Sequence, residues 1–336
     1  MKKINYSYSS PLAPYMNDYI KYYAAQGKKN NLVKFILRVI DQYLISIHHK
    51  QGEPITEDIY FGCLSKWDGC SDTTKYHNGT YIVAFFKYLS IRGIDCYVPR
   101  PPKSARSQYI PYIFSEDQVL SLFENCDKWR DRYYTFDSHA LIMPALLRLL
   151  YSTGIRINEA LSLKNRNVNI NKRYILLEGT KNYKDRLAPI NSTLAPVLSE
   201  YIKNRNRLAY PGINAPDSYF FITHSNRRCN SATVSLRFHA ILKQMGLEYY
   251  NGQHGIRVHD LRHTACVHAL VKMVRAGKDP YCCLPILSVF MGHHDTESTE
   301  YYLRLTQEAY PDIIKMDKAY TSSISDIIER ALKIEL

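Results

Sequence analysis

Residues 152–163 read STGIRINEALSL, and this stretch decides how the second half of the chain is interpreted. Gly154 is expected to end an apolar helix predicted at about 139–152, because glycine readily takes the left-handed conformation that closes helices. Arg156 then stands just past the turn, at the start of the next helix. A lone arginine is usually solvated or salt-bridged, and Arg156 could simply pair with Glu159. The stretch alone therefore indicates no function, and its interpretation depends on the segments that follow it.

Four short segments downstream carry side chains suited to phosphate chemistry. They are GTKNYKDRLAPI at 179–190, HDLRH at 259–263, FMGHH at 290–294 and TESTEYYLRL at 296–305. The first segment consists of a polar turn, GTKNYKD, and a predicted strand, RLAPI. Another predicted strand, YILLE at 174–178, precedes the turn, so the pattern indicates a β-hairpin. In the second, His259 and Arg262 are three positions apart and share one face of a predicted helix at about 260–276.

Together and in this order, the five segments closely resemble the tyrosine recombinases, also called phage-type integrases. That family carries an arginine in TGxRxxE, a lysine in a hairpin turn, HxxR, then GH and a nucleophilic tyrosine in TxxY. The resemblance covers residues from about 112 to 310. The catalytic set that it implies is Arg156, Lys181, His259, Arg262, His293 and Tyr302.

The chemistry gives each of these residue types a reason. Attack on a phosphodiester drives negative charge onto the non-bridging oxygens, which the planar guanidinium groups of Arg156 and Arg262 can stabilise. Tyr302 would be the nucleophile, forming a phosphotyrosyl link that the resemblance places on the 3′ side. Lys181 would protonate the leaving 5′ oxygen. Because the covalent link stores the energy for rejoining, no cofactor or metal is expected.

The two histidines of the set would assist, His259 in proton transfer and His293 by bonding to the scissile phosphate. Three assignments have a close rival in the sequence. The pairs are Tyr302 and Tyr301, Lys181 and Lys184, and His293 and His294. The residue spacing of the family's motifs favours the first residue of each pair. Glu159 is expected to orient Arg156 without taking part in the chemistry.

The charge of the chain agrees with a polyanionic partner. Its 336 residues include 44 Lys and Arg against 31 Asp and Glu, a net charge of +13. The total alone does not separate DNA from RNA or an anionic membrane. The five segments point to a phosphodiester held for attack, and the resemblance implies that the partner is double-stranded DNA. No apolar run approaches the ~20 residues that span a bilayer. We therefore expect a soluble, cytoplasmic, DNA-associated bacterial protein with no membrane contact.

The eight cysteines give no sign of a metal site. They show no CxxC spacing, although several histidines crowd near Cys266 and Cys282. Paired ligand spacing is the usual mark of structural zinc, so a structural metal is not expected. Most of these cysteines are expected to be small buried hydrophobes.

The predicted fold class is mainly α, with an N-terminal helical bundle and a mostly helical catalytic domain that carries a small antiparallel β-sheet. Residues 1–98 would form a helical core-DNA-binding domain, 99–111 a basic proline-rich linker and 112–336 the catalytic domain. The linker assignment rests on VPRPPKSARSQYIP, which has four prolines, three basic residues and no acid. An amphipathic stretch at 322–336 could dock on a neighbouring copy or pack on its own domain.

The sequence thus predicts a site-specific DNA recombinase serving a mobile element in integration, excision or transposition. The resemblance implies a homotetramer on DNA, with accessory recombination proteins as candidate partners. The segment between Arg262 and His293 is longer than in compact members and resembles transposon-borne ones. The alternatives are a type IB-like topoisomerase with the same chemistry and a catalytically silent DNA-binding regulator with the same fold. The DNA target sequence cannot be read from one chain.

Overall fold

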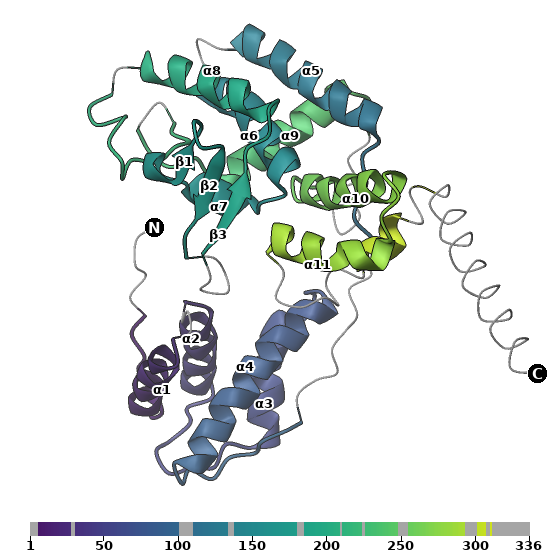
Figure 1. The fold of residues 1–336 in the computed structure, drawn as a ribbon. Helices are drawn as coiled ribbons and strands as arrows, with labels where there is room; N and C mark the ends of the chain where they lie inside the picture. Colours follow the sequence, from purple (N-terminus) through teal and green to yellow (C-terminus); the bar gives the residue numbers. More distant parts are fainter. Residues whose placement is uncertain are drawn as a thin grey trace, which may run out of the picture. The chain divides into compact units, whose positions relative to one another are not determined.

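Most of the helical patterns in the sequence form helices in the computed structural model (Figure 1). The structure describes residues 6–27, 31–100, 110–133, 138–179, 185–208, 210–223, 226–247, 255–292, 301–306 and 310. The chain divides into two compact units, Met1–Gln108 and Tyr109–Leu336. The fold is mostly helical with one small antiparallel sheet, which confirms the predicted fold class. Within the described ranges, no helix is long and apolar enough to cross a membrane.

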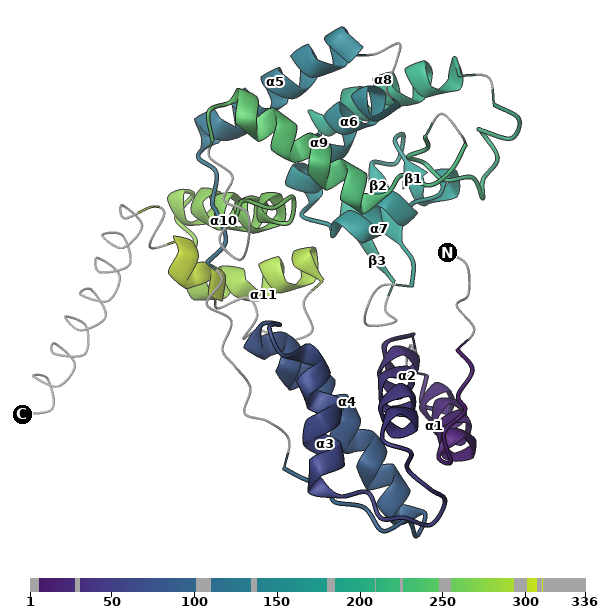
Figure 2. The same ribbon diagram turned by 180° about the vertical axis from the view of Figure 1, so that it is seen from behind.

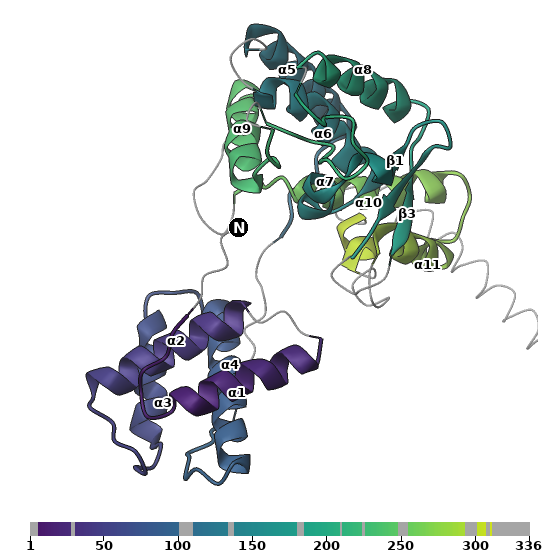
Figure 3. The same cartoon turned by 90° about the vertical axis from the view of Figure 1, so that its left-hand side faces the viewer.

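The first unit is a bundle of four helices (Figure 3). Its elements are α1 (Ala13–Ala25), α2 (Asn31–Ser46), α3 (Glu57–Leu64), a 3-10 turn (Ser65–Trp67) and α4 (Asp72–Ile91). The apolar face of α2 lies in the core, where Phe85 and Phe86 of α4 are fully buried. Asp41 is the polar exception on that face. Its carboxylate accepts hydrogen bonds from the backbone of Ser9 and Ser10, which ties the chain before α1 to the bundle.

The second unit is built around one helix that is apolar on all sides. Its helices are α5 (Glu116–Tyr133), α6 (Ser138–Thr153), α7 (Ile157–Ser162), α8 (Leu194–Asn206), α9 (Ser231–Gln244), α10 (Asp260–Arg275) and α11 (Pro280–Met291). From Ala140 to Leu150, every residue of α6 except Arg148 is buried. A helix with this pattern must be surrounded by other elements, and α5, α8 and α10 pack against it.

A three-stranded antiparallel sheet adjoins these helices in the order β1 (Val168–Asn169), β2 (Tyr174–Leu177), β3 (Arg186–Pro189). The strands of the predicted hairpin are present, with Leu177 opposite Arg186 at the end next to the turn. The backbone N–H of Gly179 donates to the Asp185 carboxylate at 2.9 Å. The base of the hairpin turn is therefore fixed on both sides.

A second layer of core joins α10, α11 and a helical segment at 301–306. Figures 1 and 2 show α10 and α11 side by side. Helix α11 shows no helical period, because its residues PYCCLPILSVFM are almost all apolar. Asp279 caps its first turn by accepting a hydrogen bond from the Cys282 N–H at 2.9 Å. Gly292 ends it with a φ of 64°.

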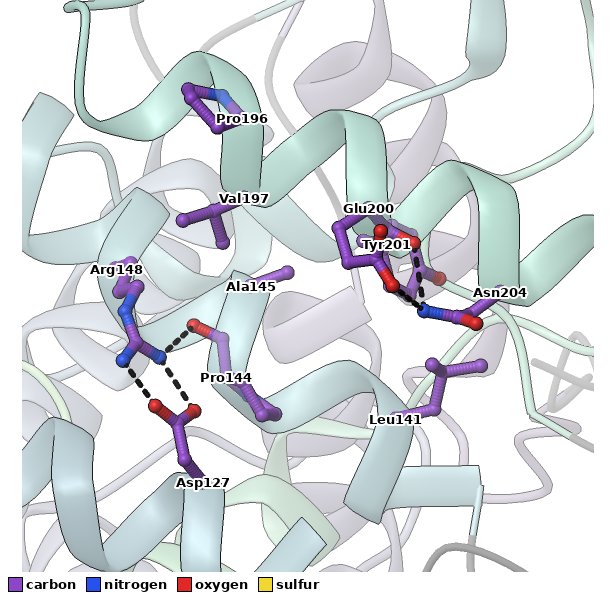
Figure 4. A pocket seen from close by; sticks show the side chains of 10 residues that line it. All are labelled: Asp127, Leu141, Pro144, Ala145, Arg148, Pro196, Val197, Glu200, Tyr201 and Asn204. Atoms are coloured by element: carbon purple, nitrogen blue, oxygen red, sulfur yellow. Dashed lines mark hydrogen bonds and ion pairs between the residues drawn. The ribbon is translucent and has the colours of Figure 1, made fainter. Parts of the chain in front are cut away.

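A cavity of about 300 Å³ lies between α5, α6 and α8 (Figure 4). One wall holds the ion pair of Arg148 and Asp127, whose closest N···O distance is 2.6 Å. Glu200 and Asn204 form a hydrogen bond along the α8 side. None of the ten lining residues belongs to the five sequence segments that carry the predicted chemistry.

Candidate active site

The turn between α6 and α7 presents Arg156. Gly154 takes a φ of +61° directly after α6, and Arg156 becomes the residue before the first turn of α7. Glu159 reaches back and accepts hydrogen bonds from the Arg156 backbone N–H and from Nη1, both at 2.9 Å. This is the pairing that the sequence left open, and it fixes the guanidinium relative to the helix start.

Glu159 also binds a second arginine, which the sequence did not single out. Arg186, the first residue of β3, donates to the two Glu159 carboxylate oxygens at 2.8 and 3.2 Å. Burial works to raise the pKa of Glu159, but the hydrogen bonds and charges of Arg186 and Arg156 outweigh it and lower that pKa. The carboxylate therefore stays ionised and holds two cations beside each other.

Arg262 connects three parts of the second unit. Its side chain extends from α10, is 3% exposed, and donates from Nη2 to the Met291 carbonyl at 2.7 Å. A second bond runs from Nη1 to the carbonyl of Gly154. Burial and the nearby Arg156 charge lower the pKa of Arg262 to about 10, so the group remains cationic at neutral pH. Two of its five N–H donors thus bind backbone carbonyls and anchor the guanidinium to the fold.

His259 occupies the position before the first turn of α10 and keeps exposure to solvent. Desolvation by the surrounding protein, followed by the charges of Arg262 and Arg156, lowers the pKa of His259 to about 4. The imidazole is therefore neutral at physiological pH. In that form it can donate from one ring nitrogen and accept at the other.

Tyr302 lies in the helical segment 301–306 and is 3% exposed. Its hydroxyl is 3.0 Å from Nδ1 of His263, one turn after His259 on α10. Burial and Cys266 raise the pKa of Tyr302, whereas Arg262 and Arg156 act to lower it. The charges of both arginines thus favour the ionised form of this hydroxyl and oppose the effect of its burial.

Tyr301, the rival of Tyr302, has a different neighbour. Its ring lies 5.3 Å from the guanidinium carbon of Arg304 in a cation–π arrangement. The Tyr302 hydroxyl meets the HDLRH helix at Nδ1 of His263.

Four of the six predicted residues are therefore linked by contacts within the second unit: Arg156, His259, Arg262 and Tyr302. His259 meets His263, which contacts the Tyr302 hydroxyl, and Arg262 bonds to the Gly154 carbonyl in the turn that presents Arg156. Lys181 and His293, with their rivals Lys184 and His294, lie outside the described residues. Arg186 opens β3 after the hairpin turn. Its guanidinium lies so close to Gly292 that a Cβ at that position would stand 2.7 Å from Nε.

Arg186 and His263 contact the site but were not among the site residues predicted from the sequence. The first carries no local pattern, since its partner Glu159 is 27 positions away. The second did carry a signal, because His263 follows His259 by four positions and so lies on the same helix face. Their rings meet edge to face at a centroid distance of 5.0 Å.

The described residues hold no group of three or more His, Cys, Asp or Glu side chains that could bind a metal ion. Five of the eight cysteines are buried: Cys63, Cys126, Cys229, Cys266 and Cys283. This agrees with their interpretation as small hydrophobic residues. The site is made of arginine, histidine and tyrosine, which are donors for phosphate oxygens.

This chain is similar to known integrases and recombinases. The family model of the phage integrase family matches residues 113–309. Tyrosine recombinase XerA of Pyrococcus horikoshii is 25% identical over 311 residues, covering 90% of this chain and 93% of the relative. The XerH site-specific recombinase, solved bound to palindromic difH substrate, shares 18% identity with a TM-score of 0.63, covering 86% of this chain and 79% of that chain.

The fold also matches a transposon integrase. The Tn1549 transposon integrase in complex with transposon right end DNA has 17% identity and a TM-score of 0.57, covering 88% of this chain and 99% of that chain. At such identities the structural likeness shows the shared fold. The family model, by contrast, spans more than half of the chain and includes every segment of the site. The chain therefore belongs to the phage integrase family of tyrosine recombinases, enzymes that cut and rejoin DNA strands.

Proposed function

We propose that this enzyme cleaves and rejoins double-stranded DNA at specific sites through a 3′-phosphotyrosyl intermediate on Tyr302, in the service of a mobile element. The observation that carries the proposal is the buried Tyr302 hydroxyl, which bonds to α10 within the electrostatic influence of Arg156 and Arg262. A tyrosine hydroxyl has an ordinary pKa near ~10, so it needs a cationic setting or a base to act as a nucleophile.

The two arginines would bind the scissile phosphate. Arg262 is anchored by two backbone carbonyls and Arg156 by Glu159, so their guanidinium groups need little reorganisation when the phosphate arrives. Preorganised donors of this kind stabilise charge that develops in the transition state. In the proposed step the Tyr302 oxygen attacks phosphorus, the bond to the 5′ oxygen breaks, and the negative charge is carried by oxygens facing the arginines.

Lys181 and His293 would complete the site, as the family register implies. Lys181 would give a proton to the 5′ oxygen, and His293 would donate to the phosphate. Neutral His259 would accept or donate a hydrogen bond there, consistent with its lowered pKa of about 4. No cofactor enters this reaction, because the phosphotyrosyl bond itself conserves the energy used in rejoining.

The mobile-element role is supported by the fold of the Tn1549 transposon integrase and by the long segment between Arg262 and His293. As proposed, the enzyme would act as a homotetramer on two DNA sites in a bacterial cytoplasm, with or without accessory recombination proteins. The net charge of +13 favours a grip on the duplex through its phosphates.

A suicide substrate tests the central step. The duplex would be built from the repeats that flank the coding region, with a nick close to the scissile phosphate so that the released piece diffuses away and the covalent adduct accumulates. We expect a protein–DNA adduct with the native enzyme, none with Tyr302→Phe, and an adduct with the matched variant Tyr301→Phe. An adduct that persists in Tyr302→Phe would refute the assignment.

A plasmid carrying two copies of the same site separates recombination from topoisomerase activity. Recombinant products are expected from the native enzyme. Relaxation of supercoils without recombinants would favour the type IB-like alternative. Specific DNA binding with neither product would favour the silent regulator.

A further inference from the structure

His263 touches the hydroxyl on which the proposed reaction depends. Its Nδ1 lies 3.0 Å from the Tyr302 oxygen, and the two rings are 5.6 Å apart between centroids with a tilt of 34°. The histidine is half-buried, and the tyrosine ring is packed into the core formed by α10 and α11. The contact joins two segments that are 39 positions apart in the chain.

Among the described residues, four other groups of the site are poorly suited to take the proton of this hydroxyl. Arg262 and Arg156 remain cationic at neutral pH and have no acceptor atom. Burial raises the pKa of the Cys266 thiol to about 12, so this group stays protonated. The lowered pKa of His259 makes it a weak base. An imidazole in hydrogen-bond contact with the hydroxyl is the group whose chemistry fits proton acceptance.

We propose that His263 is a further catalytic residue, the base that accepts the proton of Tyr302 during DNA cleavage. This inference rests on the proposed function. In the tautomer with the proton on Nε2, Nδ1 accepts the hydrogen bond from the tyrosine hydroxyl. As the Oη–P bond forms, the proton passes from Oη to Nδ1, the P–O5′ bond breaks, and O5′ receives a proton from Lys181.

Rejoining reverses each transfer. The 5′ hydroxyl returns its proton to Lys181 and attacks phosphorus, the Oη–P bond breaks, and the His263 imidazolium gives its proton back to Tyr302. The enzyme therefore ends the cycle in its starting protonation state, with no external acid or base consumed. A single imidazole that is a base in cleavage and an acid in rejoining suits a reversible reaction.

The structure offers a matched control on the same helix. His268 also binds tyrosine hydroxyls, with Nδ1 2.7 Å from Tyr151 and Nε2 2.8 Å from Tyr310. Both of its ring nitrogens thus bridge tyrosines that belong to none of the five segments. Replacement of His268 changes a half-buried histidine–tyrosine contact without touching the proposed nucleophile.

The test measures the single-turnover rate of adduct formation by the full chain on the suicide duplex. His263→Asn keeps a polar atom near the position of Nδ1 but cannot take up a proton. We expect it to slow cleavage by about 10²–10³-fold. His268→Asn should stay within about threefold of the native rate per folded molecule, folding being checked by circular dichroism and DNA binding, because it leaves the proposed base intact.

Two further measurements separate a base from a merely structural residue. A duplex with sulfur in place of the bridging 5′ oxygen has a leaving group that needs no proton, so it bypasses the acid but not the base. The His263→Asn defect should persist on this substrate. His263→Ala should recover at least about tenfold when imidazole is added to the buffer, because the small base can enter the vacated space.

The inference fails if His263→Asn cleaves within threefold of the native enzyme, if the sulfur substrate restores that variant, or if imidazole does not rescue His263→Ala. Failure of the proposed function looks different. In that case Tyr302→Phe would still form the adduct, whatever the His263 variants do.

Discussion

Arg186 donates two hydrogen bonds to the carboxylate of Glu159, the same carboxylate that anchors Arg156. The first residue of a strand and the start of a helix are thereby held together through one half-buried anion. Arg186 also lies against Gly292, the last described residue before His293. A residue outside the predicted catalytic set thus connects the hairpin, the Arg156 turn and the end of α11.

Glu159→Gln should weaken both the fold and the catalysis. The neutral amide keeps the shape but leaves Arg156 and Arg186 without a counter-charge. Breaking a fully buried ion pair costs ~3–5 kcal/mol, and we expect about 1–3 kcal/mol here because the groups retain some contact with water. Chemical denaturation measures this loss, and the cleavage rate should fall with it. Glu178→Gln, which affects the exposed pair with Arg166, should leave the unfolding midpoint nearly unchanged.

The Glu159 site also predicts a pH dependence of stability. Because the folded protein lowers the pKa of Glu159, its stabilisation is complete above the ordinary carboxyl pKa of about 4.3 and is lost as pH falls through the folded value. The difference in unfolding free energy between the native enzyme and Glu159→Gln should therefore be largest near neutral pH and shrink in acid. A difference that grows as pH falls would contradict the lowered pKa.

Gly292→Ala should displace Arg186. The backbone at Gly292 has a φ of +64°, and an added Cβ would lie 2.7 Å from Arg186 Nε. Gly277→Ala is the matched control, since its φ is +81° and its Cβ would meet nothing within 4 Å. Both variants pay the backbone cost of about 1–2 kcal/mol for a side chain in the left-handed region. Only Gly292→Ala should also lose cleavage activity. Equal cleavage rates in the two variants would rule out the Arg186 contact as a requirement.

Arg262→Lys should nearly abolish cleavage. A lysine ammonium is a point charge and cannot bond to the carbonyls of Gly154 and Met291 while facing a phosphate. We expect a loss of about 10²–10³-fold in the single-turnover rate, as for removal of one preorganised transition-state donor. Arg205→Lys provides the comparison, because Arg205 is equally buried and bonds to Asn165 and the Phe220 carbonyl. It should lower stability but keep the rate per folded molecule.

The sequence predicted those helices and strands whose pattern of apolar residues is visible within the segment itself. The apolar helix at 139–152 and the hairpin strands around 174–178 and 186–190 formed as expected. The eight-residue α3 and the two-residue β1 were not predicted, because such short elements depend on what they pack against. Helix α11 was not predicted for a different reason. Its residues are almost all apolar, so the sequence shows no helical period there.

The candidate site likewise contains residues that local motifs predict and residues that depend on tertiary contacts. Arg156, His259, Arg262 and Tyr302 were found from short motifs, and the fold brings them together. The role of Arg186 could not be predicted, because it depends on the hairpin register that sets this residue opposite Leu177 at the end of the sheet. His263 was visible as a second histidine on the α10 face. Its partner, however, lies across a tertiary contact that no local pattern encodes.

The choice between Lys181 and Lys184 can be decided by chemistry, since both lie in the hairpin turn outside the described residues. If Lys181 is the acid, Lys181→Ala should lose about 10²–10⁴-fold in cleavage of ordinary DNA, because the 5′ oxygen leaves unprotonated. The same variant should cleave the duplex with a bridging 5′ sulfur at close to the native rate. Lys184→Ala, the control in the same turn, should show a small defect that the sulfur does not change. Rescue of Lys184→Ala in place of Lys181→Ala would transfer the role to Lys184, and rescue of neither would place the acid outside the turn.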